Sequence, residues 1–405
     1  MSSFRVVEDG HVTTPRGFRA GAVYAGLKVP GPGKLDVALL VSDTPGVAAG
    51  IFTQSTVKAA PVLISQEHLA ADAAIRGFVV NAGNANACTG EEGRTNARQM
   101  AALAAERFGG GSESFLVAST GVIGHQLPMD KVRNGITAID LSPENGPLFT
   151  RAIMTTDTRP KAAAVELAID GRTVRIGGAA KGAGMIHPDM ATLLVFVTTD
   201  AALDAAFARE AIRLAGDESF NLVTVDGDTS TNDSLFLLAN GRAGNAPLTA
   251  GSPAAAAFQA ALNHVCRTLA IAVAADGEGA TKLIEVTVSG ARSLSDARRC
   301  AKSIAGSMLL KSAVYGNDPN WGRIMMAAGK SGCDLIESKV DVAIGKVDLF
   351  RQGTPLTFDV EAAAAALAGP TVSVFVNLNL GEFSATGWGC DLTEEYVHIN
   401  ADYTT

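Results

Sequence analysis

The segment KGAGMIHPDMATLLVFVTTD, residues Lys181 to Asp200, joins two halves of unlike character. The first half is rich in glycine and contains the breaker Pro188, whereas Leu193–Val197 is a continuous apolar run, typical of a strand buried on both faces. Thr192 stands at the junction, so its hydroxyl would lie at the mouth of a rigid strand, after a loop that can adopt unusual backbone angles. This position suits a nucleophile, but threonine also favours strands by its shape alone, and the pattern leaves both interpretations open.

Strand and helix patterns alternate on both sides of this junction. Short apolar runs such as Phe115–Ala118 and Leu235–Ala239 predict strands, and alanine-rich segments such as Glu91–Phe108 and Pro253–Ala274 predict helices. This alternation is typical of α/β layers and not of a β-sandwich or a helical bundle. We see no internal repeat, and the breaker-rich loop before Thr192 is the one marked boundary.

Three local patterns carry weaker predictions. The Asp170-Gly171 pair between two strand-like runs is a hairpin signal. Leu148–Thr155 fits a helix and an extended segment equally well, and the alternating tail Glu395–Asn400 fits a last strand.

The composition describes an enzyme-sized chain with an aliphatic core. Its 405 residues are 47% hydrophobic but only 5% aromatic, and this length predicts two domains or two intertwined layers. A formal net charge of -8 argues against nucleic acid or an anionic membrane as a main partner. No stretch is long and apolar enough to span a bilayer, and the first residues lack the apolar core of a signal peptide.

Cysteine and histidine usage predicts no metal site. The five cysteines are scattered and never form a Cys-x-x-Cys pair, so we expect free thiols in a reducing cytoplasm. The six histidines never fall at metal-ligand spacing. Asp226–Ser230 departs from a calcium loop because its glycine is misplaced, and Gly329-Lys330-Ser331 lacks the first glycine of a phosphate loop. We therefore predict neither a metal nor a bound cofactor.

Polar, glycine-flanked segments lie mostly at predicted strand ends, where α/β proteins assemble their sites. Each segment alone is best interpreted as a turn or a cap. They are residues 81–86, 119–124, 155–161, 181–192, 226–233, 277–282, 317–321 and 400–405. We expect residues 226–233 and 317–321 to support the pocket structurally.

Taken together, these segments resemble the ArgJ family of ornithine acetyltransferases (glutamate N-acetyltransferases) over nearly the whole chain. The matching motifs are FTQSTVKAAPV, NAGNANACTG, STGVIG, TTDTRPK, KGAGMIHPDMATLL, TVDGDTSTNDS, GEGATK, GNDPNWGRI and INADYTT. So many ordered matches are far more specific than any single motif.

The resemblance implies a layered α-β-β-α arrangement of the ArgJ/DmpA-like fold, with sheets covered by helices. It also implies that the precursor cuts itself between Ala191 and Thr192, into an α piece of residues 1–191 and a β piece of residues 192–405. The threonine hydroxyl would attack the Ala191 carbonyl, and water would open the resulting ester. The freed α-amine, with a reference pKa of about 7.7–8.0, can accept the hydroxyl proton, so no histidine base is needed.

The implied reaction is the transfer of acetyl from N2-acetylornithine to glutamate in arginine biosynthesis, a ping-pong cycle with the acetyl group held on Thr192. Thr120 and Gly121 match the family's oxyanion hole, for which a hydroxyl and a backbone N–H are suitable donors. We expect Lys181 to pair with the substrate α-carboxylate and Glu278 to pair with the ornithine ammonium. The positions that match substrate-binding residues are Thr155, Lys181, Thr192, Glu278, Asn400 and Thr405.

The resemblance further implies an α2β2 heterotetramer, and it leaves open whether acetyl-CoA is a second co-substrate. Two alternatives stay open. One is a related self-cleaving threonine acyltransferase or amidohydrolase with a different acceptor, and the other is an uncut, inactive binding protein. A denaturing gel separates the last from the enzymes, because only a self-cut chain gives two bands.

Overall fold

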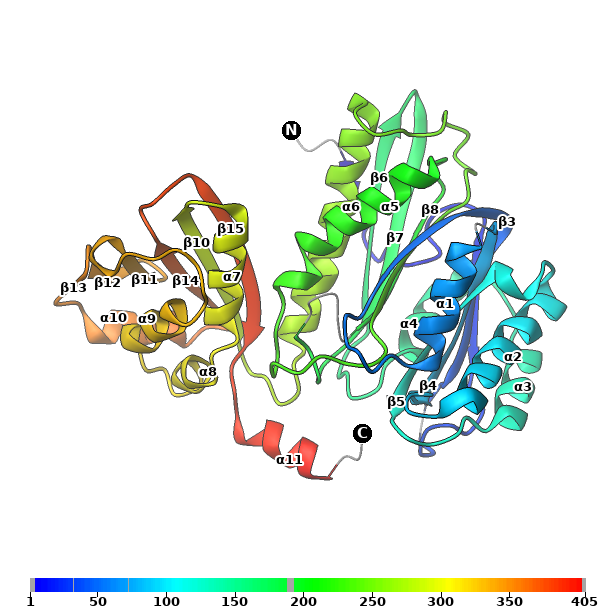
Figure 1. The fold of residues 1–405 in the computed structure, drawn as a ribbon, viewed down its shortest axis with the longest axis horizontal. Coiled ribbons are helices and arrows are strands. Elements are labelled where there is room, and N and C mark those ends of the chain that lie inside the picture. Colours follow the sequence, from blue (N-terminus) through cyan, green and yellow to red (C-terminus); the bar gives the residue numbers. More distant parts are fainter. Residues whose placement is uncertain (1–3, 32, 72, 188–192, 403–405) are drawn as a thin grey trace.

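The computed structural model describes residues 4–31, 33–71, 73–187 and 193–402. Two β-sheets covered by helices form two units that lie side by side (Figure 1). This architecture confirms the predicted mixed α/β class. None of the described helices is long and apolar enough to cross a bilayer.

The larger unit is built on a sheet with the strand order β1-β6-β7-β8-β9-β3-β4-β5, in which β2 also pairs with β3. The strands are β1 Phe4–Val6, β2 Phe18–Val23, β3 Val37–Phe52, β4 Ile75–Asn84, β5 Phe115–Val122, β6 Lys161–Ile169, β7 Arg172–Lys181, β8 Leu194–Thr199 and β9 Ser234–Ala239.

The long strand β3 folds this sheet into two layers. Its first half pairs with β2 and β4, and its second half pairs with β9. The register against β4 shifts between Val41 and Gly46, as at a bulge, where a strand bends. A Cβ atom on Gly46 would lie 2.2 Å from the carbonyl oxygen of Ala239, so the crossing needs glycine at this position.

Side chains alternate across each layer and thereby build three cores. On β3, Leu40 faces a core between the layers, whereas Leu39 faces the helices outside. The inner core contains Phe78, Phe149, Phe196 and Phe236, with contacting ring centroids 5.0 to 5.6 Å apart. The outer cores pack helices α1 to α3 on one layer and α5 and α6 on the other. The order helix, sheet, sheet, helix is the layered arrangement that the resemblance to the ArgJ family implies.

The helices of this unit are α1 Ala60–Ala70, α2 Gly90–Phe108, α3 Met129–Ala138, α4 Gly146–Ala152, α5 Ala205–Asp217 and α6 Pro253–Ala275. The predicted helices at Glu91–Phe108 and Pro253–Ala274 are therefore confirmed. Ser252 caps α6 by accepting the backbone N–H of Ala255, and Asp204 caps α5 in the same way, as these residue types do at helix starts.

The smaller unit has its own sheet, in the order β13-β12-β11-β14-β10-β15, and its own core. Its strands are β10 Leu283–Ala291, β11 Asp341–Ile344, β12 Val347–Arg351, β13 Thr354–Pro355, β14 Thr371–Asn377 and β15 Phe383–Cys390. Its helices are α7 Leu294–Ala305, α8 Met308–Tyr315, α9 Trp321–Gly329 and α10 Val360–Leu367.

Single 3-10 turns lie at residues 112–114, 143–145 and 220–222 of the larger unit and at residues 337–339 of the smaller unit.

The structure decides two of the weaker local predictions. Asp170 and Gly171 have φ angles of 50° and 71°, as the tight turn between β6 and β7 requires, so the hairpin is confirmed. The open case Leu148–Thr155 is helical over most of its length, because α4 ends at Ala152.

The prediction of a last strand at Glu395–Asn400 is wrong. These residues belong to helix α11, Glu394–Asp402. After β15 the chain leaves the smaller sheet and turns back below the larger unit (Figure 1). A strand there would need a sheet edge to pair with, whereas a helix satisfies its own backbone hydrogen bonds.

The breaker-rich loop before Thr192 does not separate the two units. Strands β7 and β8, on either side of that loop, pair with each other within the larger sheet. The sheets are joined instead through α6 and residues 276–282, which lead into β10.

Candidate active site

A cleft with a volume of about 380 Å³ opens in the larger unit, at the ends of β5 and β7 and the start of β8. Its walls come from segments that lie far apart in the sequence. They include Thr120, Gly121, Thr155, Lys181, Leu193, Asp226, Glu278, Tyr396 and Asn400. The volume suits a small molecule.

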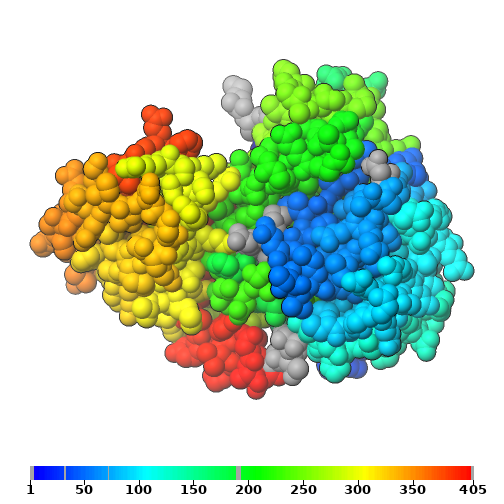
Figure 2. Space-filling model, viewed as in Figure 1, coloured from blue at the N-terminus to red at the C-terminus, as the bar shows by residue number. Residues whose placement is uncertain are grey.

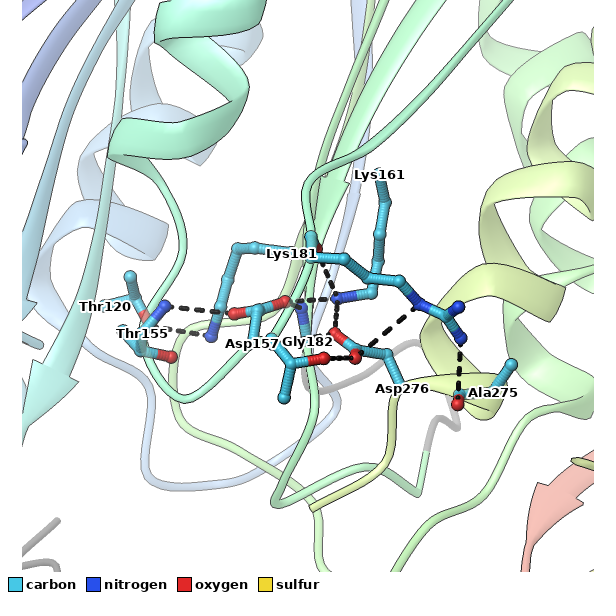
Figure 3. Close-up of polar contacts among 10 residues, drawn as sticks. Thr120, Thr155, Asp157, Lys161, Lys181, Gly182, Ala275 and Asp276 are labelled. Carbon is cyan, nitrogen blue, oxygen red and sulfur yellow. Dashed lines mark hydrogen bonds and ion pairs between the residues drawn. The ribbon is translucent and has the colours of Figure 1, made fainter. Parts of the chain in front are cut away.

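The contact between Lys181 and Thr120 bridges the two layers at the cleft. Lys181 ends β7 and pairs with Leu194 in the ladder to β8, while Thr120 lies near the end of β5 in the other layer. The Lys181 Nζ atom donates a hydrogen bond to Thr120 Oγ1 at 3.1 Å (Figure 3). An ammonium group and a hydroxyl from different layers therefore face the same space.

Gly121 allows the ends of β4 and β5 to approach closely. Its φ angle is 129°, and a Cβ atom there would lie 2.3 Å from the carbonyl carbon of Gly83. Gly83 is its partner in the parallel ladder. Any other residue would be strained by φ and would clash with the neighbouring backbone.

The Lys181 amine is buried in the wall of the cleft. Only 7% of the residue is exposed, and burial lowers the pKa of Lys181, while the negative charges of Asp157, Asp233 and Glu278 oppose that shift. Because a buried amine binds a carboxylate more strongly than an exposed one does, Lys181 is well placed to hold an anionic group.

Glu278 supplies a buried carboxylate to the same cleft. Its Oε2 accepts a hydrogen bond from Asn400 Nδ2 at 2.8 Å, and its backbone N–H donates to the Ala183 carbonyl at 2.9 Å. A Cβ atom on Gly184 would lie 2.4 Å from the carboxylate, so a side chain at this position would displace the Glu278 carboxylate. In Figure 2 the C-terminal residues that carry Asn400 lie, in red, at the lower edge of the molecule.

Residues 226–233 do more than the support role that the sequence predicts, because they also line the cleft. The Asp226 carboxylate accepts the backbone N–H groups of Met185 and Ile186 at 2.5 and 2.8 Å, and burial raises the pKa of Asp226. Behind it, Asn232 Nδ2 donates to the carbonyl of Ser119 at 2.9 Å. The high density of polar residues in this segment was the feature of the sequence that could have indicated a place in the cleft.

Ala191, Thr192 and Thr405 lie outside the described residues, so only their sequence neighbours have a described geometry. Before the predicted cut, the Ile186 carbonyl accepts the N–H of Val225 at 2.7 Å. After it, the Leu193 carbonyl accepts the N–H of Ser234 at 3.0 Å, and Leu193 lines the cleft. The described residues contain no cluster of three or more His, Cys, Asp or Glu side chains that could hold a metal ion.

Two helix-covered layers and a cleft that combines a buried amine, a hydroxyl and carboxylates define an α/β enzyme for a small polar substrate. The chain belongs to the ArgJ family, whose family model matches residues 19–405. This finding confirms the resemblance drawn from the ordered motifs.

Two relatives match the chain over 98% or more of its length. It is 51% identical over 404 residues to the arginine biosynthesis bifunctional protein ArgJ of Dehalococcoides mccartyi (strain CBDB1), covering 100% of both chains. It is 54% identical over 398 residues to the protein of the same name from Symbiobacterium thermophilum, covering 98% of this chain and 99% of the relative. The crystal structure of arginine biosynthesis bifunctional protein ArgJ from Bacillus halodurans is similar with 48% identity and a TM-score of 0.50, over 51% of this chain and 98% of that chain.

Proposed function

We propose that this enzyme transfers the acetyl group of N2-acetylornithine to glutamate, releasing ornithine and N-acetylglutamate. The observation that supports this most strongly is the cleft that gathers Thr120, Lys181 and Glu278 beside Leu193, the residue after the proposed nucleophile Thr192. Both substrates carry an α-carboxylate, which Lys181 can bind, and ornithine carries an ammonium, which Glu278 can bind.

In the proposed cycle, Thr192 Oγ1 attacks the acetyl carbonyl and the free α-amine of the same residue accepts the proton. Lys181 donates to the oxygen of Thr120, which leaves the Thr120 hydroxyl hydrogen to stabilise the oxyanion together with the Gly121 N–H. The amine passes its proton to the leaving nitrogen of ornithine. The amine of glutamate then attacks the acetyl ester, and Thr192 is restored.

Intact-mass spectrometry of freshly purified protein tests the nucleophile. We expect two pieces, divided between Ala191 and Thr192, whose masses add up to the 41.5 kDa chain plus one water. Thr192→Ala should give a single full-length species with no acetyl transfer, whereas Thr192→Ser should still cleave. A wild-type enzyme that stays uncut and still transfers acetyl would rule out this mechanism.

The dependence of ornithine release on the acceptor glutamate distinguishes a transferase from an amidohydrolase. With acetylornithine alone, a transferase should release about one equivalent of ornithine per site and stop, and glutamate should restore turnover. Continuous ornithine release without glutamate would favour an amidohydrolase.

The relatives named bifunctional favour a second acetyl donor. We propose acetyl-CoA as this donor, used to acetylate glutamate at the same threonine. A coenzyme A release assay with glutamate tests it directly, and the Thr192→Ala variant should show no release.

We also propose an α2β2 assembly in the cytoplasm. All five cysteines are free thiols, in keeping with a reducing compartment. Light scattering should give about twice the 41.5 kDa mass of one chain, and a mass equal to one chain would contradict the assembly.

A further inference from the structure

A buried ionic network of Lys161, Asp157 and Asp276 lies next to the residues that line the cleft (Figure 3). The Lys161 Nζ atom lies 2.6 Å from Asp157 Oδ1 and 2.5 Å from Asp276 Oδ2. These three side chains are at most 2% exposed. Burying charges is costly, so a network of this kind requires a reason.

Asp157 connects this network to the cleft through two backbone groups. Its Oδ1 accepts the N–H of Gly182, the residue after Lys181, at 2.7 Å, and its Oδ2 accepts the N–H of Thr155 at 3.0 Å. Both Thr155 and Lys181 line the cleft. One carboxylate therefore fixes the backbone at two points from which cleft side chains project.

The network also keeps Asp157 negatively charged. Burial alone would raise the pKa of Asp157, but Lys161, Lys181 and the Gly182 N–H outweigh burial and hold it below its ordinary value. Asp276 in turn pairs with Lys161 and with the Arg159 guanidinium, whose Nε lies 3.7 Å from Asp276 Oδ1. Because Lys161 is shared between two carboxylates, it does not fully neutralise Asp157.

We propose that Asp157, held by Lys161 and Asp276, is a positioning residue that keeps the Lys181 amine protonated and directed toward the carboxylate of the substrate. The identity of that substrate rests on the proposed function. Asp157 is the largest of the charges that favour protonated Lys181. The other charged groups that face Lys181 are Lys28, Lys161, Asp233 and Glu278.

Asp157→Asn is the direct test, because it removes the charge at nearly constant volume. The alkaline limb of kcat/KM should move to lower pH by about one unit or more, since a neighbouring opposite charge shifts a pKa by that amount. At neutral pH, the KM for glutamate and for acetylornithine should rise about tenfold, while kcat changes much less. Asp276→Asn should act in the same direction with a smaller effect, because Asp157 and Lys161 stay paired.

Glu166→Gln is the matched control. Glu166 lies on β6, the strand that Lys161 begins, and pairs with Arg5 and Arg175 near the surface. This variant removes one carboxylate charge from the same strand, and its pH profile should equal that of the wild type.

A second measurement does not depend on turnover. The rate at which acetic anhydride labels Lys181, followed by peptide mass spectrometry across pH, reports the ionisation of its amine. Labelling should begin at lower pH in Asp157→Asn than in the wild type, and Asp276→Asn serves the same purpose if the first variant does not fold. Unchanged labelling profiles overturn the inference. If the labelling shifts but the wild type transfers no acetyl to glutamate, the proposed function is wrong and the role of Asp157 stands.

Discussion

At the residue scale, the hydroxyl of Thr120 has two roles in the proposed reaction. It accepts a hydrogen bond from the Lys181 amine at 3.1 Å, and its own hydrogen is then available to the oxyanion. Thr120 is 8% exposed, so the hydroxyl lies in a partly dehydrated environment, where a hydrogen bond to a developing charge is strong.

Thr120→Val should lower kcat by about 10²- to 10³-fold, the usual effect of losing one oxyanion donor. Valine suits a strand, so thermal unfolding should change little. The matched control is Thr287→Val on β10, a threonine in the smaller sheet that faces Thr386, and it should keep full activity. A kcat of Thr120→Val within a few fold of the wild type would contradict the oxyanion role.

Glu278→Gln should raise the KM for acetylornithine about tenfold or more, because the ornithine ammonium loses its charged partner. The KM for glutamate should change less, since glutamate carries no side-chain ammonium. Glutamine can still accept the hydrogen bond from Asn400, so the cleft keeps its shape. Steady-state kinetics with acetylornithine and with glutamate test this prediction. An unchanged KM for acetylornithine would show that Glu278 does not bind the ornithine ammonium.

At the scale of single elements, helix α11 contributes to the cleft and not to a core. None of its described residues is buried, yet it carries Tyr396 and Asn400 to the cleft. Its position is fixed by local polar contacts, such as Asn400 to Glu278.

Removing residues 394–405 should therefore raise the KM for acetylornithine by at least about tenfold with little change in melting temperature. The measurements are kinetics and thermal unfolding monitored by circular dichroism. A truncated enzyme with normal kinetics would show that α11 is not part of the site, and an unfolded product would show that the helix has a structural role.

The close packing between the ends of β4 and β5 leads to a second prediction at the scale of single elements. Gly121→Ala introduces both an unfavourable φ and a clash with Gly83, and should cost more than about 3 kcal/mol of stability. Gly124→Ala is the control, because its φ is 85° but nothing lies within 4 Å of the added Cβ, so it should cost roughly 1 kcal/mol. Equal denaturation midpoints for the two variants would show that the clash is relieved.

At the scale of the whole molecule, the predicted cut lies in the sequence between two strands that pair in one sheet. Residues 176–181 of β7 pair with residues 194–199 of β8, and the two strands lie on opposite sides of the cut. Lys161 and Asp276, also on opposite sides, form a buried ion pair.

The two pieces should therefore stay together after cleavage. They should elute as one species in native gel filtration, also at high salt, and separate only in a denaturing gel. High salt screens charges at the surface. It does not disrupt the buried hydrogen bonds between β7 and β8 or the apolar core. Separation of the pieces without denaturant would contradict this arrangement.

By itself, the sequence determined the mixed α/β class, the hairpin at Asp170-Gly171, the long helices and the ArgJ family. Helix and strand periods, turn residues and ordered motifs are written in short stretches, so they can be read without a fold. The candidate residues Thr120, Lys181 and Glu278 came from motif matching in the same way.

Only the tertiary structure decided how these pieces meet. It showed that β3 crosses two layers, that the tail is a helix beside the cleft, and that Lys161 lies buried between Asp157 and Asp276. Lys161 and Asp276 are 115 residues apart, so no local pattern relates them. Burial and charge pairing depend on which distant segments pack together, and that is set by the whole fold.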